Sequence, residues 1–287
     1  MSEIMLIGIH GLQNKPPANY LEQCWASAID ESLRRNCNIA HHPSFTLAYW
    51  ADLCHKTPIP VAEFDEPYIK ADGDGPFERC QIGILDKTRA VAEKWNGELI
   101  DKGKQLFGLS QDTVDALLGA NFDDLRVYYD NTEKRQQIRA RLAELLEEYK
   151  PKRLMLIAHS MGSIVAYDVL RSYENSGLFQ VEHLITVGSP LGLPLVAYKI
   201  QEEFGSKQTP QNVQRWTNFA DPWDKVALDC NLADEYETNS HGVQVSDALI
   251  HNLYVNPQGK ANHHNICGYL RTPEVCECVR KFLMSGT

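Results

Sequence analysis

A short apolar run that leads straight into a serine between small residues is the feature that most constrains this chain. Arg153 is followed by the apolar residues 154–157, which predict a buried strand. Ala158, Ser160 and Gly162 then form a small-x-Ser-x-Gly pattern, and an apolar helix is predicted behind it. In such a strand–turn–helix the serine sits on a sharp turn at the edge of a sheet. The helix directs its N–H groups and its dipole at any negative charge that develops there.

The rest of the chain alternates between strand and helix. Residues 4–9 and 45–50 read as strands, and a helix over about residues 18–35 joins them, which makes a parallel pair. Further strands are predicted at 181–187 and 213–220. We therefore predict an α/β fold over residues 1–287, with a mostly parallel sheet of about six strands flanked by helices in a single domain.

Residues 53–125 break this alternation. Prolines and an Asp-Gly run mark irregular loops, and apolar periodicity predicts helices over about residues 80–120. An insertion of this kind between core elements is a candidate lid or cap over a pocket. The alternative is a helical layer on the sheet with no gating role.

Composition excludes several classes of function. The net charge of −10 argues against nucleic acid and anionic membranes as partners. No apolar run is long enough to span a membrane, and the N-terminus lacks the pattern of a signal peptide, so we expect a cytoplasmic protein. The eight cysteines are then most simply free thiols. Cys276 and Cys278 lack a second pair with zinc-ligand spacing, so we expect neither a metal nor a cofactor.

The first predicted strand ends in His10-Gly11. At the carboxyl edge of a sheet, glycine lets the backbone approach closely, and the amide of Leu12 can then point at an oxyanion. The alternative is an ordinary glycine turn, with His10 as a hydrogen-bonded structural residue. Because Ser160 ends a neighbouring strand, we favour the oxyanion hypothesis.

A serine hydroxyl needs a base within hydrogen-bond reach, and a histidine base needs a carboxylate to hold its tautomer. Downstream of Ser160 the chain offers Asp221 and Asp224 after one strand, and His263 and His264 in a late loop. The order Ser…Asp…His is typical of one of the folds that use this triad.

With these parts in place, the sequence resembles the α/β-hydrolase superfamily, and in particular lipase- and esterase-like members that open on a strand ending in His-Gly. The resemblance covers nearly the whole chain except residues 53–125, and Ala158 stands where glycine is commoner. It implies Ser160 as the nucleophile and the amides of Leu12 and Met161 as the oxyanion hole.

The resemblance also favours one member of each Asp and His pair. Asp224-Lys225-Val226-Ala227 is similar to the Asp-Pro-Val-Ala pattern of some relatives, and Asp221 is the alternative. His264, four residues before Gly268-Tyr269-Leu270, is similar to the relatives' His-x-x-x-Gly-Tyr-Leu stretch, and His263 is the alternative.

These residues predict a serine hydrolase that cleaves a carboxylic ester or thioester through an acyl-enzyme. An acyltransferase would use the same groups, and an inactive hydrolase-fold binding protein is the rival from another class. The apolar helices of the insertion favour a small-molecule substrate with an acyl or other apolar group. The sequence leaves the oligomeric state open.

Overall fold

The fold is built on a six-stranded sheet whose strands are all parallel, in the order β2-β1-β3-β4-β5-β6. The computed structural model describes residues 3–40, 42–79, 81–83, 86, 123–227 and 230–285. The strands are β1 (Ile4–Ile9), β2 (Phe45–Ala48), β3 (Arg153–His159), β4 (His183–Val187), β5 (Trp216–Ala220) and β6 (Val245–Leu249).

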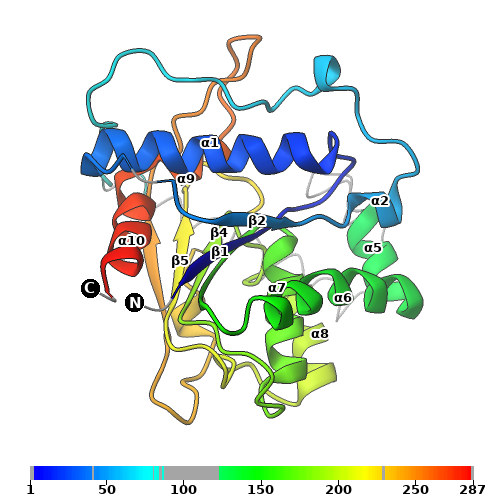
Figure 1. Ribbon diagram of the computed structural model, residues 1–287. Coiled ribbons are helices and arrows are strands. Elements are labelled where there is room, and N and C mark those ends of the chain that lie inside the picture. Colours follow the sequence, from blue (N-terminus) through cyan, green and yellow to red (C-terminus); the bar gives the residue numbers. More distant parts are fainter. Residues whose placement is uncertain are drawn as a thin grey trace.

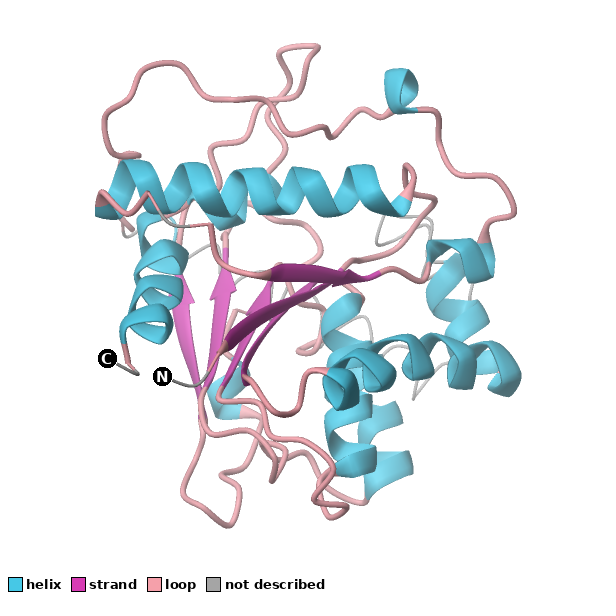
Figure 2. Ribbon diagram, in the orientation of Figure 1, coloured by secondary structure: helices cyan, strands magenta, loops and turns pink. Residues whose placement is uncertain are grey.

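Helices cover both faces of this sheet (Figure 1). One face carries α1 (Ala18–Cys37), α9 (Ile266–Arg271) and α10 (Pro273–Met284). The other carries α5 (Asp123–Asp130), α6 (Thr132–Glu148), α7 (Gly162–Tyr173) and α8 (Pro194–Phe204). Shorter helical turns are α2 (Ala51–Cys54), η1 (Val61–Glu63) and η2 (Leu232–Asp234). In the view of Figure 2, long loops pass above α1 and below the sheet.

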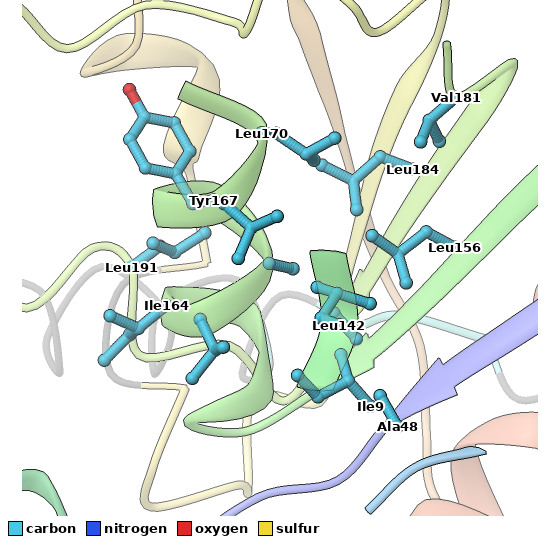
Figure 3. Close-up of a cluster of buried hydrophobic side chains, with 14 of the residues drawn as sticks. Ile9, Ala48, Leu142, Leu156, Ile164, Tyr167, Leu170, Val181, Leu184 and Leu191 are labelled. Atoms are coloured by element: carbon cyan, nitrogen blue, oxygen red, sulfur yellow. The ribbon is translucent and has the colours of Figure 1, made fainter. Parts of the chain in front are cut away.

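Two apolar clusters hold these layers together. Figure 3 shows part of the one around α7, where Leu170 lies toward Leu184 and Leu156 of the sheet and Ile164 lies on the other side of the helix near Leu191. The cluster on the opposite face centres on Trp25 of α1 and includes residues of α9 and α10. The central strands are therefore buried on both faces, which explains why their sequences are continuous apolar runs.

The register of the parallel strands brings their exit loops to one edge. Ala158 of β3 aligns with Ile9 of β1, and Val187 of β4 aligns with His159 of β3 and with Phe219 of β5. Residues that follow these positions therefore meet at the same edge of the sheet.

The predicted α/β fold with a parallel sheet is confirmed. The helix predicted at 18–35 extends two residues further, and the edge strand β6 was not predicted because its sequence, VSDAL, has two polar residues and little apolar alternation. Most of the proposed 53–125 insertion lies outside the described residues, so its role as a lid stays a prediction, as does the single-domain organisation. No helix in the described ranges is long and apolar enough to cross a membrane.

Candidate active site

Ser160 sits in a strained turn between β3 and α7. Its φ is 56°, in the left-handed region that non-glycine residues rarely adopt. The Ser160 N–H donates to the carbonyl of Val187 on β4 at 3.1 Å, and the Ser160 carbonyl accepts from the Ser163 N–H at 2.9 Å. The small residue at the end of the pattern is required, because a Cβ on Gly162 would lie 2.5 Å from the carbonyl oxygen of Ile9. Strain of this kind is concentrated at functional sites.

The loop after β1 passes directly against this turn. A Cβ on Gly11 would lie 2.5 Å from Ser160 Cβ and 2.9 Å from its Oγ. In the part of the chain that the structure describes, neither the Leu12 N–H nor the Met161 N–H has a hydrogen-bond acceptor. Two amide donors next to Ser160 are therefore available to an anionic oxygen.

His10 is a structural residue of this loop. The Trp50 N–H donates to His10 Nε2 at 3.0 Å, so the proton lies on Nδ1, which donates to the Gly11 carbonyl at 2.8 Å. Burial, and then the charge of Lys15, lowers the pKa of His10 to about 3, so the ring is neutral. The hydrogen bonds of His10 therefore hold the backbone of the loop that contains Leu12.

His264 and Asp224 form a close pair. His264 Nδ1 lies 2.8 Å from Oδ2 and 3.0 Å from Oδ1 of Asp224. The same carboxylate accepts from the Tyr269 hydroxyl at 2.7 Å and from the Val226 N–H at 2.9 Å, and its side chain is fully buried. With the proton held on Nδ1, the other ring nitrogen of His264 is left to act as a base.

This pair packs on the turn after β4. A Cβ on Gly188 would lie 2.8 Å from Asp224 Oδ2 and 3.0 Å from His264 Nδ1, and Gly188 has a φ of 56°. Because the Val187 carbonyl accepts a hydrogen bond from the Ser160 N–H, the turn after β4 contacts both the serine and the pair of His264 and Asp224.

Several effects together raise the pKa of His264. Burial, the largest single effect, lowers the pKa, but the charge of Asp224, its hydrogen bond and the charge of Glu66 together raise it, and the net shift is upward. An imidazolium formed at His264 during a reaction is therefore stabilised.

His263 and Asp221 form a second pair at the same edge. His263 Nδ1 lies 2.9 Å from Asp221 Oδ2, and Asp221 also accepts from the N–H groups of Trp223 and Asn252, each at 2.8 Å. His263 is more exposed than His264, and its ring lies near that of Trp223, with centroids 6.4 Å apart. Both alternative assignments thus correspond to real Asp–His contacts, and the three atoms nearest a Cβ on Gly188 all belong to the His264–Asp224 pair.

His159 packs against His264. Its ring centroid lies 4.6 Å from that of His264, and it directly precedes Ser160. Within the described ranges, no hydrogen bond joins the Ser160 hydroxyl to His264. Contacts of this kind are often long in a free enzyme and tighten when substrate binds.

Three side chains around the site were missed in the sequence: His159, Asn252 and Tyr269. Tyr269 lies in the stretch similar to His-x-x-x-Gly-Tyr-Leu, so a signal for it existed. His159 and Asn252 had none, because His264 lies 105 residues beyond His159 and the contacts of Asn252 depend on how its loop folds. Among the described side chains, no group of three His, Cys, Asp or Glu residues is arranged to hold a metal ion.

More than half of the chain matches the model of a known family. Residues 93–249 match the model of a family described as "Alpha/beta hydrolase of unknown function (DUF915)". The match includes Ser160 and Asp224 and ends before His264. No curated protein matches the sequence.

Proposed function

Because the chain belongs to the alpha/beta hydrolase family whose model spans residues 93–249, we propose that it is a serine hydrolase acting on a carboxylic ester or thioester. The observation that carries the proposal is the backbone of Ser160, held at a φ of 56° between a strand and a helix. The contact between His264 and Asp224 at the same edge of the sheet supports it further.

The first half of the reaction would form an acyl-enzyme. His264 takes the proton of the Ser160 hydroxyl as its oxygen attacks the carbonyl carbon of the substrate. The carbonyl oxygen becomes an oxyanion, and the free N–H groups of Leu12 and Met161 donate to it. The tetrahedral intermediate then collapses, and the alcohol or thiol leaves with the proton from His264.

Water would complete the reaction. His264 takes a proton from a water molecule, whose oxygen attacks the acyl carbon, and the proton returns to Ser160 as the acid departs. Asp224 stays ionised and holds the imidazole in one tautomer through both halves. The hydrogen bond from Tyr269 stabilises the charged carboxylate in its buried position.

The test is labelling by a fluorophosphonate probe, with neighbouring residues as matched controls. The intact protein should be labelled, and Ser160→Ala should not. His264→Gln should lower the labelling rate by about 1000-fold, while His263→Gln, one residue away, should stay within about threefold of the wild type.

Three results would contradict the proposal. Absence of labelling in the intact protein would remove the serine hydrolase assignment. Labelling that persists in Ser160→Ala would move the nucleophile elsewhere. A greater loss in His263→Gln than in His264→Gln would transfer the role of base to the pair of His263 and Asp221.

A further inference from the structure

The loop that carries His264 is held by two side chains, one at the end of β3 and one just beyond β6. The carbonyl of His264 accepts from His159 Nε2 at 2.8 Å. The carbonyls on either side of it, those of His263 and Asn265, both accept from Asn252 Nδ2, at 2.9 and 2.7 Å. Three successive carbonyls are therefore bound by two side chains.

His159 is suited to act as a fixed donor. It ends β3, and its side chain is buried between His264, Trp25 of α1 and Tyr269 of α9. Because a carbonyl only accepts, the contact with His264 places the proton of His159 on Nε2. Burial, and then the charge of His264, lowers the pKa of His159 well below its ordinary value, so the ring stays neutral.

Asn252 is likewise held in place by hydrogen bonds. It is buried just beyond β6, its N–H donates to Asp221 Oδ2 at 2.8 Å, and its Oδ1 accepts from the Tyr254 N–H at 3.1 Å. A Cβ on Gly268 would lie 1.7 Å from Asn252 Oδ1, so the glycine leaves the space that the amide occupies.

These bonds fix the direction of one side chain. The His263 carbonyl belongs to the peptide plane before the Cα of His264, and the His264 carbonyl belongs to the plane after it. Holding both planes fixes φ and ψ of His264, and with them the direction in which its Cβ points. A shift of about 1 Å in a catalytic group can cost about 100-fold in rate.

We propose that His159 and Asn252 form a backbone clamp that aims His264, and that both are positioning residues for the reaction. The proposal rests on the proposed function, since it assumes that His264 is the base. Neither residue needs to touch the substrate.

The kinetic test compares variants of two buried histidines. His159→Leu removes the donor and should lower kcat by about 100-fold, with KM changed by less than about threefold. His159→Gln keeps an N–H donor at a similar reach and should recover kcat to within about tenfold of the wild type. The control is His183→Leu: His183 is also buried, its Nε2 lies 2.9 Å from Thr217 Oγ1, and it begins β4 at the opposite edge of the sheet. Its kcat should stay within about twofold.

A second readout does not depend on turnover. In ¹⁵N NMR spectra of the histidine rings, wild-type His159 should carry its proton on Nε2 and should not titrate between pH 5 and 9 (roughly the working range of histidine). The pKa of His264 should fall in His159→Leu, because a looser His264 makes a poorer contact with Asp224. Glu66 and Lys15, whose charges also act on His264, are present in both proteins.

The outcomes distinguish failure of the clamp from failure of the proposed function. If the fluorophosphonate probe does not label Ser160 in the wild type, the proposed function fails, whatever the spectra show. If Ser160 is labelled but His159→Leu keeps the kcat of His183→Leu, the clamp is overturned. If His159→Leu does not fold, the wild-type spectrum decides: a proton on Nδ1 of His159 overturns the clamp, and one on Nε2 supports it.

Discussion

Replacing Gly188 by alanine is the most informative single change in the turn that supports the His–Asp pair. Gly188 has a φ of 56°, and a Cβ there would lie 2.8 Å from Asp224 Oδ2 and 3.0 Å from His264 Nδ1. The substitution therefore combines two costs: a left-handed backbone that alanine disfavours, and a methyl group pressed against the buried pair.

The two costs have different sizes and different consequences. An alanine in the left-handed region costs about 1–2 kcal/mol relative to glycine. Overpacking a methyl group into a filled space costs roughly 1–3 kcal/mol more. Because the methyl group can relax only by displacing Asp224 or His264, we expect kcat to fall by about 100-fold as well.

Gly177 provides a matched control. Its φ is 68°, and a Cβ there would meet nothing within 4 Å. Gly177→Ala thus carries the backbone cost, and the same change in unfolded-state entropy, without the contact. Urea unfolding followed by tryptophan fluorescence gives the difference in unfolding free energy, and hydrolysis of p-nitrophenyl esters gives kcat.

The expected result is that Gly188→Ala is roughly 1–3 kcal/mol less stable than Gly177→Ala and far less active. If the two variants had equal activity, the pair of His264 and Asp224 would not be the one that serves catalysis. Equal stability with unequal activity would mean that the pair yields to the methyl group at little energetic cost.

Three other predictions concern the pKa of His264, the contact of Gly11 with Ser160, and a buried ion pair between α6 and α7. His264 acts as a base only when it is neutral, and its pKa is raised. In a pH–rate profile, kcat/KM should therefore increase with pH through a midpoint above the ordinary histidine pKa of 6.5, and a midpoint at or below 6.5 would contradict this. Gly11→Ala should abolish fluorophosphonate labelling because its Cβ would lie 2.5 Å from Ser160 Cβ; labelling at the wild-type rate would refute the contact. Arg139→Met removes the guanidinium 2.6 Å from the buried Asp168 carboxylate and should cost about 3 kcal/mol in urea unfolding, whereas a cost below about 1 kcal/mol would show that the ion pair is dispensable.

The architecture was predictable because its signals are local. The strand around residue 155, buried on both faces, is a continuous apolar run, and α10 begins with Thr272 as its cap and Pro273 in its first turn, a local pattern typical of a helix start. The edge strand β6 gives no such signal, because its half-exposed positions tolerate polar residues.

For the candidate site too, the residues with local sequence signals were predictable and the contacts between distant loops were not. The candidate serine, aspartates and histidines were singled out by their order along the chain and by short patterns, and their catalytic roles stay predictions. The pairing of His264 with Asp224 and of His263 with Asp221 depends on how two loops fold against each other, which no local pattern encodes. The contact between Asn252 and the His264 loop depends in turn on a glycine sixteen residues beyond Asn252, at Gly268.

The most direct measurement is mass spectrometry of an acid-quenched reaction with p-nitrophenyl esters of short and long acyl chains. Nucleophilic catalysis by Ser160 predicts a covalent acyl group on the peptide that contains it, and loss of both the acyl group and p-nitrophenolate release in Ser160→Ala. An acyl group on another residue, or release that continues at the wild-type rate in Ser160→Ala, would contradict it.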